Sequence, residues 1–396
     1  MKFGELGNSA NRRKIVFVLP SFAAGGAERV LITLMNALDR SQYAPEMICL
    51  RKDGPLRALV AADIPVHAPN DYRKVSFGLP RLLKILRKTK PDIIVSTMAH
   101  MNFGVLMLRP FLPKSAKIII REAITPSYVF DTVNSKWLVK MLYKILYPSA
   151  EKVISPAQAI VDEFKSLSFL KTDHFTLLYN PVNIKKIREE VPQILQCLND
   201  ERKSTVHFVC AGRLHPQKGF DRLIESLPWI SHEMNWKLTI LGKGDERDNL
   251  KALIEKNGLQ DKVHLAGFSA APWPQIGASD CFLLPSRYEG LPNVVLESLC
   301  VGTPVIALRE AGGVGEIAGL APEGSVTICE DMPEFLEAMR QVRPHPSRVY
   351  RPTLLPPSFR PEVVQKRFEA LLRGENPDML APARPEETSS AATPTT

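Results

Sequence analysis

Short apolar runs alternate with segments of helical periodicity along most of the chain. Residues 14–20 are almost entirely apolar, and residues 28–38 carry apolar side chains at every third or fourth position, which is the pattern of a buried strand followed by a helix. Further strands are predicted at residues 46–50, 93–96, 118–121 and 152–155, and helices at 80–87 and 136–147. Strands that alternate with helices predict a parallel sheet wound on both faces.

The pattern breaks at residues 179–183 and then repeats. Strands of this second series are predicted at residues 206–211, 238–241, 263–266, 281–284 and 304–307, and helices at 220–227 and 245–257. We therefore predict an α/β protein with two Rossmann-like, doubly wound domains, residues 1–183 and 184–357. Two such sheets facing each other leave a cleft, the commonest place for a ligand. Residues 375–396, rich in Pro, Ser and Thr, are predicted to be a disordered tail.

The composition is that of an ordinary soluble globular protein. The 396 residues are 45% hydrophobic and 23% charged. No apolar run approaches the roughly 20 residues of a membrane-spanning helix, and the N-terminus lacks the apolar core of a secretion signal. The six cysteines are scattered without CxxC or His pairing, which favours buried reduced thiols over a zinc site or a disulfide framework. We expect a cytoplasmic protein.

Charge is unevenly distributed. Residues 1–150 hold 23 Lys and Arg against 10 Asp and Glu, a net of +13, whereas residues 151–396 hold 28 against 32, a net of −4. The basic first domain favours an anionic membrane surface or acceptor, and no nucleic-acid-binding motif accompanies it. Segments 79–90 and 137–147 mix apolar residues with Lys and Arg, so we interpret them as peripheral contacts with the inner face of the cell membrane. Helices packed on a sheet with a solvated basic side give the same pattern.

The most informative chemistry lies in residues 286–304. Glu289 follows a predicted strand, and Glu297 lies about two turns into the helix after it. The loop between them holds Gly290, Leu291, Pro292 and Asn293, whose backbone N–H groups at a helix N-terminus suit a phosphate. A carboxylate on each side can accept hydrogen bonds from two polyols, a sugar and a ribose. The segment therefore predicts a nucleotide-sugar site at the carboxyl edge of a parallel sheet.

The string Glu-Gly-Leu-Pro-Asn-Val-Val-Leu-Glu-Ser-Leu at residues 289–299 resembles the E-x7-E signature of retaining glycosyltransferases of family 4, which have the two-domain GT-B fold. Two more blocks agree with this. Residues 211–220, Ala-Gly-Arg-Leu-His-Pro-Gln-Lys-Gly-Phe, resemble the phosphate-binding block of the family, and residues 25–29, Gly-Gly-Ala-Glu-Arg, resemble its glycine-rich loop. The similarity runs from about residue 14 to residue 372. It implies that a last helix, residues 358–374, crosses back to the first domain.

The resemblance implies roles for individual residues. Arg213 and Lys218 would stabilise the negative charge of a departing diphosphate without a metal, although a solvated basic loop is the alternative. Glu297 would bind the ribose and Glu289 the transferred sugar. Phe268 marks the point where relatives hold the base, and Gly242 would line the same pocket. Gly25 and Gly26 would let the backbone approach the donor closely, or would only turn a strand into its helix.

One departure from the family pattern concerns the mechanism. Many relatives have a histidine after a first-domain strand, but residues 120–127 here contain none. Glu122 or Arg121 is the candidate replacement in that loop. His100, after another first-domain strand, is a second candidate, with a purely structural role as the alternative.

We therefore predict a hexosyltransferase-type glycosyltransferase. It would move a sugar, with retention, from a nucleotide-sugar, most simply a UDP-sugar, to a lipid-linked or saccharide acceptor during assembly of cell-surface polysaccharide or glycolipid. No metal and no cofactor beyond the donor substrate are expected. One alternative is a GT-B scaffold protein that binds nucleotide-sugars without turnover. Another is a different GT-B chemistry, such as a sugar-nucleotide epimerase or a phosphorylase.

Overall fold

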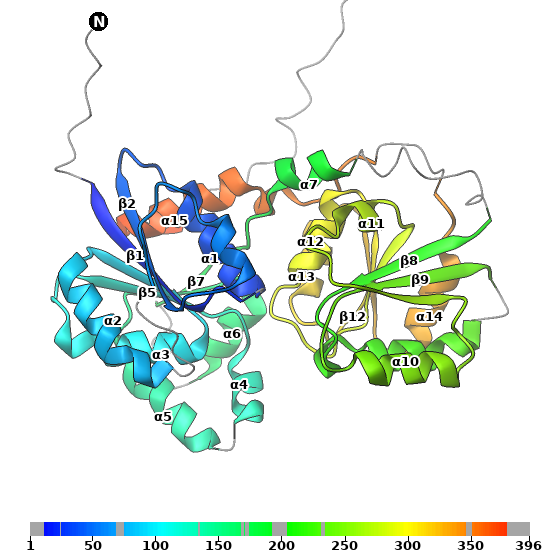
Figure 1. Ribbon diagram of the computed structural model, residues 1–396, viewed down its shortest axis with the longest axis horizontal. Coiled ribbons are helices and arrows are strands. Elements are labelled where there is room, and N and C mark those ends of the chain that lie inside the picture. Colours follow the sequence, from blue (N-terminus) through cyan, green and yellow to red (C-terminus); the bar gives the residue numbers. More distant parts are fainter. Residues whose placement is uncertain are drawn as a thin grey trace, which may run out of the picture. The chain divides into compact units, whose positions relative to one another are not determined.

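The computed structural model describes residues 12–23, 25–68, 75–133, 135–167, 170, 174–191, 204–230, 234–345 and 351–377 (Figure 1). The described residues divide into two compact units. Unit 1 contains the chain up to Pro181 and the segment that begins at Val364, and unit 2 contains Val182–Val363. The tail predicted at residues 375–396 lies outside the described residues from residue 378 onward.

Unit 1 is built on a seven-stranded parallel sheet with the order β3-β2-β1-β4-β5-β6-β7. Its strands are β1 (Arg13–Ser21), β2 (Tyr43–Arg51), β3 (Val66–His67), β4 (Ile93–Thr97), β5 (Lys117–Arg121), β6 (Lys152–Ser155) and β7 (Phe175–Leu177). Its helices are α1 (Gly26–Ala37), α2 (Val75–Thr89), α3 (Ala99–Met107), α4 (Pro126–Thr132), α5 (Lys136–Leu146), α6 (Gln158–Ser166) and most of α15 (Pro361–Arg373).

The core of unit 1 lies on both faces of the central strands. Ile15 to Leu19 of β1 are fully buried, as expected for a strand covered by helices on each side. Helix α15 packs here, with the Phe368 ring centroid 6.3 Å from that of Phe17 and Arg13 Nη1 donating to the Leu372 carbonyl at 2.6 Å.

Unit 2 is built on a six-stranded parallel sheet with the order β10-β9-β8-β11-β12-β13. Its strands are β8 (Val206–Ala211), β9 (Trp236–Leu241), β10 (Val263–Gly267), β11 (Cys281–Leu284), β12 (Val305–Leu308) and β13 (Val326–Cys329). Its helices are α7 (Ile184–Glu190), α9 (Phe220–Ser226), α10 (Arg247–Lys256), α11 (Trp273–Gly277), α12 (Asn293–Cys300), α13 (Val314–Leu320) and α14 (Met332–Gln341).

Both sheets reverse their strand order beside their first strand, at β1/β4 and at β8/β11. The prediction of an α/β protein with two doubly wound parallel sheets is therefore confirmed. Such a reversal opens the carboxyl edge of a sheet to ligands. Most of the residues singled out in the sequence follow strands at these carboxyl edges. The strands β1, β4, β8 and β11 flank the two reversals, and β5, β9 and β10 lie farther along the sheets.

Within the described ranges, no helix is both long enough and apolar enough to cross a bilayer. The five described cysteines are buried and unpaired, and Cys197 lies outside the described residues.

Candidate functional site

Two loops at the carboxyl edge of the unit 2 sheet are joined through their backbones. The first contains the short 3-10 helix η7 (Pro216–Lys218), and the second leads from β11 to α12. The Arg287 N–H donates to the Gln217 carbonyl at 2.8 Å, and Gln217 Nε2 donates to the Tyr288 carbonyl at 3.0 Å. These bonds fix both loops in one arrangement.

Lys218 and Glu289 meet between these loops. Lys218 Nζ lies 2.6 Å from Glu289 Oε1, and Ser286 Oγ donates to the same oxygen at 2.8 Å. The lysine side chain is 18% exposed and the glutamate side chain 10%. The pair is therefore partly shielded from water, where a charge-assisted bond is stronger than on an open surface.

Glycines make this close approach possible. Gly219 has φ +65°, and a Cβ there would lie 2.0 Å from the Pro285 carbonyl oxygen. A Cβ at Gly242 would lie 1.8 Å from the Gly212 carbonyl oxygen, so the loops after β8 and β9 touch through their main chains. The stem of Lys218 passes over Gly212, whose Cβ position would lie 3.1 Å from Lys218 Cε.

Glu297 lies in the second turn of α12, after the loop that carries Glu289. Trp273 Nε1 donates to Glu297 Oε2 at 3.0 Å, and the Trp273 side chain is buried. Gly290, Leu291, Pro292 and Asn293 lie between the two carboxylates, where α12 begins. The positive end of the helix dipole therefore lies between them.

Arg213 and Phe268 border the same edge. Arg213 is exposed and makes no ion pair within the described part of the chain. Phe268 is 52% exposed, and Lys243 Nζ lies 5.1 Å from its ring centroid. The preceding Gly267 has φ +81°, and its carbonyl accepts from the Gly242 N–H at 2.7 Å.

In unit 1, the glycine-rich loop follows β1. Gly26 begins α1, and Gly25 packs against the buried Glu28, because a Cβ at Gly25 would lie 2.0 Å from Glu28 Oε2. Gly25 therefore has a packing reason to be glycine, which leaves its predicted ligand role open.

Glu122 lies inside unit 1. Its Oε1 accepts hydrogen bonds from the Tyr147 hydroxyl and, at 2.6 Å, from Asn102 Nδ2. Burial raises the pKa of this carboxyl from 4.5 to about 7, against the opposing effect of these two donors. Its neighbour Arg121 is also buried and donates from Nη2 to Asn180 Oδ1 at 2.6 Å. Neither side chain is reachable from solvent.

His100 differs from Glu122 in being exposed, on the first turn of α3. Neighbouring protein still desolvates its ring in part and lowers its pKa. The preceding Met98 has φ +75°, a backbone conformation that a residue with a side chain seldom adopts. The structure thus places His100 on the exposed first turn of α3, whereas Asn102 of the same helix bonds to the buried Glu122.

Several residues of these edges were not singled out in the sequence. Ser286, Gln217 and Trp273 each bond to a residue of the second loop or of α12. Only Ser286 is close to its partner in sequence, so it alone had a local signal. Within the described ranges, no group of three or more His, Cys, Asp or Glu residues has a metal-binding arrangement.

Comparisons with known proteins agree with this architecture. The family model "Glycosyltransferase Family 4" matches residues 24–186, and the model "Glycosyl transferases group 1" matches residues 198–346. The Campylobacter jejuni enzyme N-acetylgalactosamine-N,N'-diacetylbacillosaminyl-diphospho-undecaprenol 4-alpha-N-acetylgalactosaminyltransferase is 26% identical over 321 residues, 78% of this chain and 84% of that protein. The amylovoran biosynthesis glycosyltransferase AmsD of Erwinia amylovora is 26% identical over 297 residues, 74% of this chain and 80% of that protein.

Among solved structures, Anabaena HepE in complex with UDP-glucose superimposes with a TM-score of 0.72 at 18% identity, over 91% of this chain and 99% of that one. The two family models cover consecutive segments that together make up most of the sequence. This chain therefore belongs to the group 1 glycosyltransferases of family 4 and has the GT-B fold.

Proposed function

We propose that the protein transfers a sugar from a UDP-sugar to a lipid-linked or saccharide acceptor in the assembly of a cell-surface polysaccharide, with retention of anomeric configuration. The observation that carries this proposal is the Lys218–Glu289 pair, held beside the N-terminus of α12. The names of the relatives support the substrate classes. The Campylobacter enzyme is named for a diphospho-undecaprenol acceptor, and HepE was crystallised with UDP-glucose.

The donor binds at the carboxyl edge of unit 2. Lys218 and Arg213 contact the diphosphate, together with N–H groups at the start of α12. Glu289 accepts hydrogen bonds from the transferred sugar, and Glu297 accepts them from the ribose. Phe268 and Gly242 border the base.

Transfer breaks the bond between the anomeric carbon and the β-phosphate oxygen, and the electron pair stays on that oxygen. An acceptor hydroxyl forms the new bond on the same face of the sugar, and its proton passes to the departing phosphate. Arg213 and Lys218 stabilise the charge that grows on the leaving group. This stabilisation needs no metal ion in the proposed mechanism. His100, at the exposed β4–α3 turn, is the unit 1 candidate for contact with the sugar.

Unit 1 binds the acceptor and rests on the membrane. Helix α3 contacts α2, α5 and the 3-10 turn Arg109–Phe111, and this group of elements exposes large apolar side chains among many Lys and Arg. Phe77 is 69% exposed and Trp137 is 74% exposed. The other exposed apolar side chains of these elements are Met107, Phe111, Leu138 and Ile145. A surface that combines apolar and basic side chains suits an anionic bilayer.

Donor binding is tested by thermal stabilisation with UDP-, GDP- and ADP-sugars. The parent should respond most strongly to a UDP-sugar, and Lys218→Ala and Glu297→Ala should each reduce that response. Lys251→Ala, which removes an exposed lysine of α10, is the matched control. If both site variants kept the parent's response, the donor site would be misplaced.

Turnover is tested separately with the best donor and a polyprenyl diphosphate-linked saccharide, and the anomeric configuration of the product is measured by NMR. An inverted product would overturn retention. Donor binding without transfer or hydrolysis would favour the non-catalytic scaffold, for which the absence of histidine at residues 120–127 is the motivating observation.

A further inference from the structure

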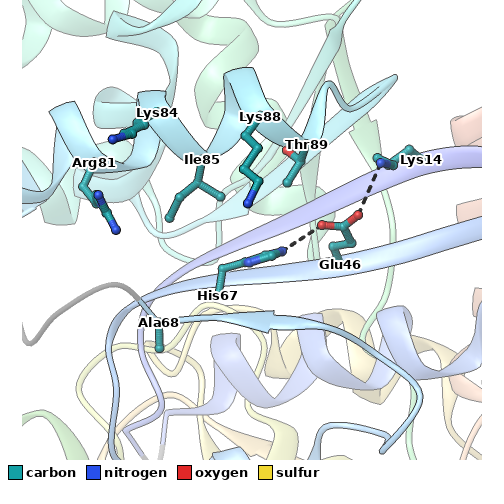
Figure 2. Close-up of a pocket in the computed structure, with 9 residues that line it drawn as sticks. All are labelled: Lys14, Glu46, His67, Ala68, Arg81, Lys84, Ile85, Lys88 and Thr89. Atoms are coloured by element: carbon teal, nitrogen blue, oxygen red, sulfur yellow. Dashed lines mark hydrogen bonds and ion pairs between the residues drawn. The ribbon is translucent and has the colours of Figure 1, made fainter.

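Unit 1 has a second candidate binding region, a pocket. Its lining contains none of the residues proposed above to contact the donor or the sugar. The pocket has a volume of about 550 Å³ and lies between α2 and strands β1, β2 and β3. Figure 2 shows α2 on one side and the strands on the other. Its charged and titratable lining consists of Arg81, Lys84 and Lys88 from α2, and of Lys14, Glu46 and His67 from the strands.

The packing of α2 places its cations at this pocket. Leu82 and Leu86 are fully buried against the sheet. Arg81, Lys84 and Lys88 follow one another at intervals of three and four residues, so they lie along another face of the helix. In Figure 2 the Arg81 and Lys88 side chains point from the helix toward the strands. Burial of Leu82 and Leu86 therefore fixes the rotation of α2, which places its three basic side chains at the pocket.

The carboxylate in the lining is already paired. Glu46 Oε2 lies 2.8 Å from His67 Nε2, and Glu46 Oε1 lies 3.5 Å from Lys14 Nζ. Within the described part of the chain, Arg81, Lys84 and Lys88 have no carboxylate partner. The lining thus carries four Lys and Arg side chains against one carboxylate. A concave surface with an excess of one sign concentrates the electrostatic field and attracts the opposite charge.

The pocket is separate from the edge that carries the transfer chemistry. Lys14 is the second residue of β1, and the glycine-rich loop follows the other end of the strand at Ser21. Seven residues of extended chain span about 23 Å. An anion bound beside Lys14 is therefore too far from the Gly25 loop to share that site.

We propose that this pocket binds a phosphate ester, with Arg81, Lys84 and Lys88 as its principal ligands. Arginine can hold two phosphate oxygens at once, and lysine acts as a compact point charge. The phosphate belongs either to a phospholipid headgroup or to a soluble phosphate ester, since both present the same group. This inference does not depend on the proposed transfer reaction, because its readout is binding alone.

The test compares two triple variants of the full chain. The pocket variant is Arg81→Gln/Lys84→Gln/Lys88→Gln. The control variant, Lys52→Gln/Lys114→Gln/Lys165→Gln, removes the same charge from exposed positions of unit 1. One arm titrates glycerol 3-phosphate by calorimetry, and the other measures sedimentation with vesicles of phosphatidylglycerol and phosphatidylcholine.

The pocket variant should bind about tenfold more weakly or worse, and the control variant should stay within about twofold of the parent. A difference in both arms shows that a phosphate ester suffices, and a difference with vesicles alone assigns the headgroup. The proposal would be overturned if both triple variants lost the same affinity, or if neither lost any. Equal losses would mean that the anion is attracted by the overall positive charge of unit 1 and not by this pocket.

A single substitution gives an independent readout. Glu46→Gln removes the carboxylate of the pocket and should tighten phosphate binding severalfold. Glu151→Gln removes a carboxylate that pairs with Lys117 elsewhere on unit 1, and it should leave the affinity unchanged. If Glu46→Gln did not tighten binding in either arm, the bound anion would lie outside this pocket.

Discussion

The carboxyl edges of the two sheets carry charge in different ways. In unit 2, Lys218 and Glu289 form an ion pair that water still reaches. In unit 1, Arg121 and Glu122 are buried, and both are held by uncharged partners such as Asn180, Asn102 and Tyr147. The first arrangement can exchange one partner for a ligand, whereas the second cannot do so without opening the core. A charged residue after a strand thus faces a ligand only where the neighbouring loops leave it accessible.

The accessibility has a local cause in each unit. The loops around Lys218 contain Gly212, Gly219 and Gly242, which lie close to backbone or to the lysine stem and leave room for its head group. The residue that covers Glu122 is Tyr147, at the end of α5. Glycines thus border the partly exposed Glu289, whereas an aromatic residue contacts the buried Glu122.

The sharpest test of the comparison is Lys218→Ala. In the proposed mechanism Lys218 stabilises the leaving diphosphate, so its loss should reduce kcat/KM about 100- to 1000-fold. Donor-dependent transfer measures the effect, with Lys251→Ala as the control. Activity within about threefold of the parent would show that the Lys218–Glu289 ion pair has only a structural role.

Gly242→Ala should disturb the same edge without removing a charge. The added Cβ would lie 1.8 Å from a backbone oxygen, so the main chain must shift, at a cost of about 2–4 kcal/mol in the free energy of unfolding. Urea denaturation measures this cost. Gly315→Ala, in α13 with nothing within 4 Å of the new Cβ, should leave stability equal or slightly higher. Equal stabilities of the two variants would contradict the loop contact.

Glu122→Gln tests the buried edge through pH. Burial raises the folded-state pKa to about 7 from 4.5, so the folded protein binds more protons than the unfolded chain between these values. Glu122 therefore contributes a stability term that is present below pH 4.5 and is lost as pH rises toward 7, by about 2–3 kcal/mol. The amide of the Glu122→Gln variant does not titrate, so the variant would lack this loss.

The measurement is the free energy of unfolding of the parent and of Glu122→Gln from pH 5 to pH 8. The variant should gain relative to the parent as pH rises, and the difference should level off above pH 7. A constant difference over this range would mean that Glu122 is ionised in the folded protein throughout.

Glu297→Ala should have the smallest effect of the four. In the proposed site Glu297 binds a ribose hydroxyl, so loss of its carboxylate should weaken donor affinity about tenfold. A donor without the 2′-hydroxyl sharpens the test, because the parent should discriminate against it and the variant should not. Equal discrimination by both proteins would place the ribose elsewhere.

Much of the fold was predictable because its central strands have a local signature. The run from Ile15 to Leu19 is buried throughout and is recognisable from composition alone. The edge strand β3 (Val66–His67) and the strand β7 (Phe175–Leu177) were missed because two or three residues show no periodicity.

The placement of the candidate site residues on the fold was predictable where these residues are consecutive. Glu289 and Glu297 lie on one loop-helix segment whose sequence is distinctive. The contacts that hold this segment were not predictable, since Gln217 reaches Tyr288 across 71 positions of sequence. The burial of Glu122 was hidden for the same reason, because it depends on Tyr147 and not on the residues beside it.

The salt bridge between Lys218 and Glu289 has a consequence for the order of recognition. A free monosaccharide would find the Glu289 carboxylate already bonded to Lys218, so it would bind weakly. In the proposed site, the diphosphate of a nucleotide-sugar attracts Lys218, and the carboxylate of Glu289 is then free to accept hydrogen bonds from the hexose. Under the proposed function, recognition of the sugar would therefore depend on its attachment to a nucleotide diphosphate.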